Sequence, residues 1–352
     1  MKKAASFALG CKVNQYESEA IAELFAEKGY EIVGIDEEAD VYVINTCTVT
    51  NFGDKKSRQL IRKVKRQNEN AIVAVVGCYA QTAPKELMEI AGVNLVIGTK
   101  DRAQIVEMVE QYDRANGVEN HVSDIMKERV FEPLSIQKLA NRTRAYLKIQ
   151  DGCSQYCSYC IIPYARGPIR SREPQEVVAE VKRLAENGFK EVVLTGIHVA
   201  SYGKDRRDTS LLDILKQVHE VEGIERIRFS SIEPNVVTEE FAQTMAALPK
   251  VCDHFHLSLQ SGCDKTLKEM NRKYDTEKYR QAVATLRKYL PKVALTTDII
   301  VGFPGETEED FRESYAFAEE IGFAKIHVFP YSPKRGTPAA ARKDQLLNAG
   351  KF

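Results

Sequence analysis

Three cysteines stand close together in the stretch Asp151-Gly152-Cys153-Ser154-Gln155-Tyr156-Cys157-Ser158-Tyr159-Cys160, at the spacing C-x3-C-x2-C. The apolar run 145–149 just before it is typical of a short strand, so we expect the cysteines on the loop that follows. Three thiolates on one loop can hold three corners of a 4Fe–4S cluster, although such clusters normally take four cysteines. The fourth iron is then left open to a small molecule.

A zinc site and a disulfide are the alternatives. Structural zinc sites close with a fourth cysteine or histidine, but the next histidine after Cys160 is His198 and no second C-x-x-C follows. The eight cysteines of this 352-residue chain do not form the dense framework of a small secreted domain. The pattern therefore favours an iron–sulphur cluster.

The composition indicates a globular protein of about two domains. Basic and acidic residues balance at 50 each, so any preference for nucleic acid must come from a local patch. No apolar run approaches the ~18 residues of a membrane span, and no signal peptide follows the first residues. We expect a cytoplasmic protein with no membrane partner.

The first part of the chain predicts an α/β domain with a doubly wound parallel sheet. The expected strands are 4–9, 40–45, 71–76 and 94–97, and the expected helices are 15–28, 55–67, 85–90 and 102–112. Alternation of such strands with helices is typical of parallel sheets covered on both faces. We assign residues 1–116 to this domain and the polar stretch 117–142 to a linker.

Cys11, Cys47 and Cys78 each fall at the end of one of these expected strands. The carboxyl ends of parallel strands form the ligand crevice of such sheets, so the three thiols are expected to converge. Buried free cysteines are common in cores and remain the alternative. The shared position favours a second cluster held by three thiolates.

The helix expected at 55–67 carries no acidic residue between Asp54 and Glu69. Its cations are Lys55, Lys56, Arg58, Arg62, Lys63, Lys65 and Arg66. A solvated helix face is the simple interpretation, but a patch of one sign in a neutral protein favours contact with nucleic-acid phosphates. Lys138, Arg142 and Arg144 are further candidates for such contact.

The second part predicts a partial (β/α)6 barrel over residues 143–335. Its six expected strands are 145–149, 191–195, 226–230, 254–259, 294–301 and 325–331, with helical patterns between them. Site residues are expected after the strand ends, and polar or glycine-rich segments do lie there, at 196–198, 231–234, 260–262 and 302–306. His198 is a ligand or, more simply, a hydrogen-bonding residue. Cys252 and Cys263 lack metal spacing.

Together these motifs resemble those of the radical S-adenosylmethionine (SAM) methylthiotransferases. The motifs are 9–18 (LGCKVNQYES), 45–50 (NTCTVT), 77–78 (GC), the central cysteine loop and 297–307 (TDIIVGFPGET). The resemblance implies a radical-generating 4Fe–4S cluster on Cys153, Cys157 and Cys160 and an auxiliary one on Cys11, Cys47 and Cys78. We expect the SAM pocket to include Tyr159, Gly196, Ser231, Glu233, Asp298, Val301 and Gly302.

The family has three branches. Two act on adenosine 37 of tRNA, with an isopentenyl or a threonylcarbamoyl group on N6, and the third acts on an aspartate of a ribosomal protein. Residues 11–17 are most similar to the threonylcarbamoyladenosine branch, which implies a 2-methylthio product formed by radical C–H activation. The other two branches are alternatives within the family. A non-enzymatic iron–sulphur carrier or metal sensor is the alternative outside it, but it needs no partial barrel.

The resemblance also implies partners. An electron donor such as flavodoxin or ferredoxin is expected to reduce the cluster, and the sulphur donor is not identified by the sequence. Family members continue into a small RNA-binding barrel. We therefore interpret residues 336–352 as a stub that leads toward such a module.

Overall fold

The computed structural model describes residues 1–49, 51–136 and 144–346, so the candidates Lys138 and Arg142 lie outside the described residues. The first domain contains a six-stranded, all-parallel sheet in the order β2-β1-β3-β4-β5-β6. The strands are β1 (Lys3–Ala8), β2 (Glu31–Ile32), β3 (Val41–Thr46), β4 (Ile72–Gly77), β5 (Leu95–Ile97) and β6 (Glu119–Asn120). Every residue of β3 is buried, as expected for a central strand covered on both faces.

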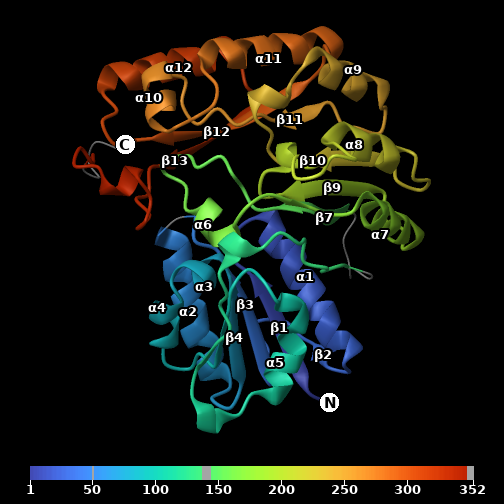
Figure 1. Cartoon of the computed structure of the whole chain (residues 1–352), viewed down its shortest axis with the longest axis vertical. Coiled ribbons are helices and arrows are strands. Elements are labelled where there is room, and N and C mark those ends of the chain that lie inside the picture. Colours follow the sequence, from blue (N-terminus) through green and yellow to red (C-terminus); the bar gives the residue numbers. More distant parts are fainter. Residues whose placement is uncertain (50, 137–143, 347–352) are drawn as a thin grey trace.

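Helices cover both faces of this sheet, which confirms the doubly wound prediction (Figure 1). One face packs against α1 (Lys12–Glu27) and α5 (Ile105–Gln111), and the other against α2 (Asn51–Gln67), α3 (Cys78–Thr82) and α4 (Pro84–Met88). The short helix α3 was not predicted. Pro84 separates it from α4, because a proline favours an extended residue before it and can open a new helix.

The stretch expected to be a linker is built into both domains. Its residues 119–120 form β6 and pair with β5. Leu134 and Ile136 are buried in the hydrophobic core of the second domain. The segment therefore packs into both domains, whereas the sequence predicted a linker without a place in either domain.

The second domain is a curled, partly open barrel, as predicted. One sheet has the order β10-β9-β7-β8 and the next has the order β11-β12-β13. Their bounds are β7 (Arg144–Asp151), β8 (Arg170–Ser171), β9 (Glu191–Gly196), β10 (Arg226–Phe229), β11 (His254–His256), β12 (Ala294–Val301) and β13 (Lys325–Pro330). A parallel bridge between Ile232 and Leu257 continues the curve from one sheet to the other. Strand β8, which is antiparallel to β7, was not predicted.

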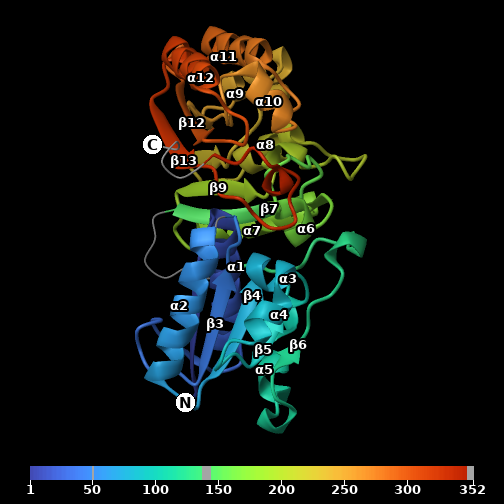
Figure 2. The ribbon, with the colours of Figure 1, turned by 90° about the vertical axis from the view of Figure 1, so that its left-hand side faces the viewer.

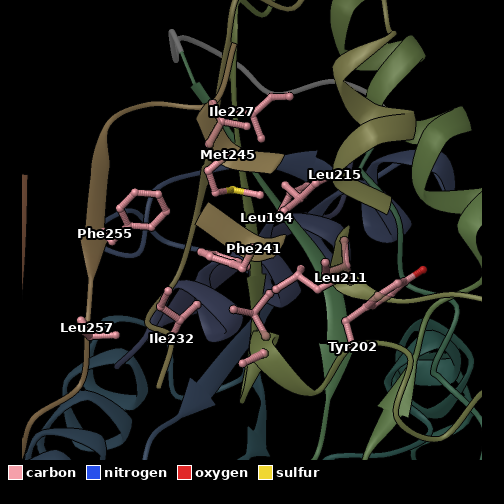
Figure 3. Close-up of a cluster of buried hydrophobic side chains, with 14 of the residues drawn as sticks. Leu194, Tyr202, Leu211, Leu215, Ile227, Ile232, Phe241, Met245, Phe255 and Leu257 are labelled. Atoms are coloured by element: carbon pink, nitrogen blue, oxygen red, sulfur yellow. The ribbon is translucent and has the colours of Figure 1, made fainter. Parts of the chain in front are cut away.

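Helices pack on the outside of this barrel (Figures 1 and 2). They are α7 (Pro174–Glu186), α8 (Leu211–His219), α9 (Glu239–Ala247), α10 (Asp264–Glu269), α11 (Thr276–Tyr289) and α12 (Glu308–Ile321). Figure 3 shows part of the core between strands and helices, where Leu194 of β9 and Ile227 of β10 meet Leu215 of α8 and Phe241 of α9. A further helix, α6 (Ile162–Arg166), lies at the junction of the two domains.

A buried cluster of charged side chains joins the domains. Glu17 of α1 is fully buried, and its carboxylate lies 2.7 Å from Arg102 Nη1 of the first domain. It also lies 2.7 Å from Lys148 Nζ of β7 and 2.5 Å from Arg166 Nη1 of α6. Lys148 in turn lies 2.5 Å from Asp151, the residue that ends β7 and begins the central cysteine loop. The cluster thus fixes α1 against the strand that carries the loop.

In the three ranges described above, no helix combines the length and the apolar character that crossing a membrane requires.

The substitution Glu17→Gln is expected to lower the free energy of unfolding by about 3–5 kcal/mol, because it leaves buried cations without their shared counter-ion. Denaturant unfolding followed by circular dichroism measures this change. Glu38→Gln, which removes an exposed charge, is the matched control and is expected to stay within about 0.5 kcal/mol of the parent. Equal stability of the two variants would contradict the joining role of the cluster.

Candidate functional site

The first cysteine set lies at the carboxyl ends of strands of the first sheet, as predicted. Cys11 directly precedes α1, Cys47 directly follows β3, and Cys78 is the first residue of α3 after β4. Because β1, β3 and β4 are neighbouring parallel strands, the three thiols share one edge of the sheet. This edge is directed toward the barrel (Figure 1).

Close packing and hydrogen bonds fix the position of these thiols. Gly10 has a φ of +119°, and a Cβ on it would lie 2.5 Å from the Cβ of Cys47. The Cys11 thiol donates to Asn14 Oδ1 at 3.1 Å, and Asn14 Nδ2 donates to the Thr46 carbonyl at 2.9 Å. The role of Asn14 was not predicted, although it lies within the motif that follows Cys11.

The central cysteine loop is held against the chain that follows α6. Gly152 has a φ of +74°, and a Cβ on it would lie only 1.8 Å from the Pro168 carbonyl oxygen. The N–H of Cys153 donates to the Gly167 carbonyl at 3.0 Å. A residue with a side chain at position 152 would therefore push the loop away from its support.

Residues beyond the barrel also hold this loop. The N–H of Ala339 donates to the Ser158 carbonyl at 2.8 Å, and Ala339 is buried beside Phe303 and Tyr331. The part of 336–352 that is described, interpreted from the sequence as a stub, thus packs against the candidate site.

Each cysteine set has an arginine against one of its sulphur atoms. Arg166 Nε lies 3.1 Å from Cys78 Sγ, and Arg272 Nη1 lies 3.1 Å from Cys157 Sγ. Each guanidinium donates an N–H to its sulphur and places a positive charge beside it. Neither arginine was predicted, because each reaches its cysteine from a distant part of the chain.

One thiol of the first set and all three of the second line one cavity of about 530 Å³, here called the cysteine cavity. Cys11 lines it from the first domain, together with Val49, and Cys153, Cys157 and Cys160 line it from the barrel. Residues far apart in the sequence therefore face one space between the domains.

The chemistry of the donor set fits iron–sulphur clusters. All eight cysteines are free, so no disulfide competes for them. Burial raises the pKa of Cys153 to about 11 and the pKa values of Cys160 and Cys47 to about 12. Free thiols at these positions stay protonated near neutral pH, so metal binding must displace their protons.

A compact trio of possible metal ligands occurs at one place among the described residues. Sulphur ligands of one tetrahedral zinc lie roughly 3.8 Å apart, given Zn–S distances of ~2.3 Å. Among the described residues, one trio of histidine, cysteine or acidic side chains has its ligand atoms all within 4.8 Å of one another, and that trio is His256, Asp298 and His327. Neither cysteine set forms such a trio.

Four of the residues predicted to contact SAM line the cysteine cavity, namely Tyr159, Gly196, Ser231 and Glu233. Glu233 lies 3.2 Å from His198 Nε2 and 2.8 Å from Arg272 Nη2. Burial by itself would raise the pKa of Glu233, but the hydrogen bond from His198 and the charge of Arg272 hold it below its ordinary value. The His198 ring hydrogen-bonds to the Ser201 hydroxyl through Nδ1, at 2.6 Å. Glu233 is an anion that lines the cavity.

The structure places the other three residues elsewhere. Asp298 lies inside β12, three residues before its end, and its side chain lies 3.3 Å from His256 and 3.2 Å from His327. It lines a second cavity within the barrel. Val301 and Gly302 do not line the cysteine cavity, and the Gly302 N–H donates to Glu306 Oε2 at 2.5 Å. Of the seven residues predicted for the SAM pocket, these three therefore lie outside the lining of the cysteine cavity.

The predicted basic helix is α2, and it exposes most of its cations. Lys55, Lys56, Arg62, Lys63 and Arg66 are exposed. Lys63 pairs with Asp36 of the same domain.

Two other cations of α2 are used within the fold. Arg58 donates to the Tyr79 hydroxyl at 2.9 Å, and Lys65 donates to the Ala71 carbonyl at 3.2 Å. These two residues are therefore weak candidates for phosphate contact.

Two family models match the chain. The model of the Radical SAM superfamily matches residues 147–318, and that of an uncharacterized protein family, UPF0004, matches residues 3–98. The first match covers most of the barrel and the second covers most of the first domain.

Curated relatives match nearly the whole chain. A threonylcarbamoyladenosine tRNA methylthiotransferase MtaB of Bacillus subtilis is 50% identical over 98% of this chain and 77% of that protein. A protein of the same name from Aquifex aeolicus is 41% identical over 98% of this chain and 84% of that protein. A tRNA-2-methylthio-N(6)-dimethylallyladenosine synthase of a Thermoanaerobacter species is 38% identical over 97% of this chain and 74% of that protein.

Solved structures share the fold across both domains. The radical SAM methyltransferase TsrM from Kitasatospora setae, with cobalamin and a 4Fe–4S cluster bound, has a TM-score of 0.68 over 97% of this chain and 74% of that chain, at 16% identity. The cobalamin-dependent radical SAM enzyme OxsB has a TM-score of 0.61 over 97% of this chain and 55% of that chain, at 12% identity. At these identities the likeness extends to the fold alone.

Gly10→Ala is expected to destabilise the protein more than Gly29→Ala does. Both glycines have positive φ values, but an added Cβ meets Cys47 at position 10 and meets nothing within 4 Å at position 29. The backbone conformation costs about 1–2 kcal/mol in each variant, and overpacking adds about 1–3 kcal/mol in the first. Denaturant unfolding measures both, and equal losses would mean that the contact between Gly10 and Cys47 does not constrain the site.

Proposed function

The chain belongs to the methylthiotransferases of the radical SAM superfamily, and we propose that it converts N6-threonylcarbamoyladenosine at position 37 of tRNA anticodon loops to the 2-methylthio derivative. The observation that carries the substrate is the 50% identity, over 98% of this chain, to a relative named for that activity. The geometry of the site supports it, because one cavity brings Cys11 of the first cysteine set to the three cysteines of the central loop.

The residues present fit two 4Fe–4S clusters and SAM. Cys153, Cys157 and Cys160 would hold the cluster that binds SAM, and Cys11, Cys47 and Cys78 would hold the auxiliary cluster. When bound, these groups supply a radical able to take hydrogen from an unactivated C–H bond and the sulphur that replaces it.

The role of the chain is to place and shield these groups. Val13, Val49, Ile162 and Ile197 give the cysteine cavity an apolar wall, which keeps water away from a reactive species. Glu233 offers an ionised carboxylate to the cavity. Because SAM carries an ammonium and a sulphonium group, we assign Glu233 to hold the cationic end of the cofactor.

Tyr159 is positioned to form a wall of the SAM site. Its ring packs edge-on to Phe303, with the centroids 6.5 Å apart, and the residue lines the cysteine cavity. Phe303 belongs to a small buried cluster with Met270, Tyr331 and Ala339, and Tyr159 packs against this cluster.

The tRNA substrate has to deliver an unstacked base into the cavity. Bases of single-stranded loops can be splayed out and bound individually, which suits a site enclosed between two domains. The exposed cations of α2, in the domain that carries Cys11, supply phosphate contacts for the surrounding RNA. A small electron donor such as flavodoxin or ferredoxin reduces the cluster in the cytoplasm, where tRNA is modified.

Cys157→Ala and Cys47→Ala are expected to fail in different ways. Cys157→Ala removes a ligand of the SAM-binding cluster, so reductive release of 5′-deoxyadenosine is expected to stop. Cys47→Ala leaves the barrel intact, so this release persists while methylthio transfer is lost. Chromatography of 5′-deoxyadenosine and of digested tRNA from the same reactions distinguishes them.

Iron analysis is the control for this pair. Reconstituted parent protein is expected to hold about eight irons, and each variant about four. Normal methylthio transfer by Cys47→Ala would make the first cysteine set structural. Product on isopentenyladenosine tRNA or on a ribosomal protein, with none on threonylcarbamoyladenosine tRNA, would place the chain in one of the other branches.

Charge reversal on α2 is expected to weaken tRNA binding and flatten its dependence on salt. Arg62→Glu and Arg66→Glu each remove an exposed cation, and each lost phosphate contact lowers the slope of log affinity against log salt by roughly 0.7–0.9. Lys182→Glu and Lys216→Glu, exposed on the outer helices α7 and α8, are the matched controls. Binding titrations at several salt concentrations give the slopes, and identical slopes in all four variants would make α2 a solvated face.

A further inference from the structure

The interior of the partial barrel contains a second cavity, of about 690 Å³, here called the barrel cavity. Each of the six parallel barrel strands contributes to its lining, and Lys12 reaches it from the start of α1. Lys12 and Ser231 line both this cavity and the cysteine cavity. The two cavities therefore adjoin at these two residues.

Cations outnumber anions in the barrel cavity. Its fixed charges are four cations, Lys12, Arg144, Arg228 and Lys325, and two carboxylates, Glu191 and Asp298. This excess is local, because the whole chain carries no net charge. Three histidines, His254, His256 and His327, add to the lining.

Both carboxylates are already engaged. Glu191 lies 3.1 Å from Arg228 and 2.9 Å from Arg226, and the pKa of this carboxyl is lowered: burial alone would raise it, but the hydrogen bonds from Arg226 and Arg228 outweigh burial. Asp298 lies between His256 and His327. Within the described residues, neither Lys12 nor Lys325 has a carboxylate within 4.0 Å.

The excess of positive charge contributes to a lowered pKa at a neighbouring histidine. Burial, and then the charge of Arg228, lower the pKa of His254. The same charges argue against a metal ion at His256, Asp298 and His327, because a cation would enter an already positive space and both oxygens of Asp298 already face imidazoles. An anion, in contrast, gains from these surroundings.

We propose that the barrel cavity binds the carboxylate of the threonylcarbamoyl group, with Lys12 and Lys325 as its counter-ions, while the adenine ring lies in the cysteine cavity. This inference rests on the proposed function and names the residues that select its substrate. An isopentenyl group offers no charge to these lysines, so a base that carries it leaves them unpaired. Discrimination of this kind comes from the unmatched polar groups of the site.

The test compares two RNAs that differ by one charge. Anticodon stem-loops carry either threonylcarbamoyladenosine or its methyl ester, and initial rates of methylthio product give kcat/KM for each. The parent is expected to prefer the acid by at least about tenfold, the size of one charge-assisted hydrogen bond. Lys325→Met and Lys12→Met are expected to lose about tenfold on the acid, so that the preference collapses.

Lys292→Met is the matched control, since Lys292 is exposed on the loop before β12 and lines neither cavity. Lys325 is itself exposed on β13, so its substitution leaves the core unchanged, and iron content checks that Lys12→Met retains its clusters. Equal losses on both RNAs would assign the lysines to an RNA phosphate and overturn the proposal. An unchanged preference in both variants would also overturn it. If the parent converts neither RNA but still cleaves SAM, the proposed function itself has failed.

Discussion

The carboxylate of Glu17 is the constraint on which the arrangement of the two domains depends. It lies at the point where α1 meets β7, and it neutralises cations from both domains. Burying so many charges brings little net stability compared with an apolar core, but it penalises every arrangement that leaves one of them unpaired. The cluster therefore acts mainly on the relative position of the domains.

The same charged cluster also reaches both cysteine sets. Arg166 contacts both Glu17 and the Cys78 sulphur, and Asp151 belongs to the cluster and begins the central loop. A shift of one domain against the other would disturb both cysteine sets together. The shape of the cysteine cavity thus depends on the ion pairs of this buried cluster as well as on the loops that line the cavity.

Much of the fold and the location of the site could be predicted from the sequence. Strand–helix alternation predicted the parallel strands of both domains, and all six cysteines lie after strand carboxyl ends as expected. The side chains that orient them were less accessible: Arg166 and Arg272 approach their cysteines through contacts between distant segments, which no local pattern records. Asp298 lines the barrel cavity and not the cysteine cavity, because it lies inside β12, three residues before the strand ends. The short edge strands β2, β6 and β8 were missed because two residues give no periodicity.

Several side chains at the start of α1 make contacts that depend on their angular position around the helix. Cys11 faces the cysteine cavity, Lys12 also reaches the barrel cavity, Asn14 holds the neighbouring strand end and Glu17 anchors the barrel. A helix advances about 100° per residue, so inserting or deleting one residue here would rotate some of these side chains away from their partners whatever residue was chosen. Residues of this segment can therefore be substituted, but insertions or deletions in it are expected to be rare. Length differences between homologues are expected in the outer loops of the barrel instead.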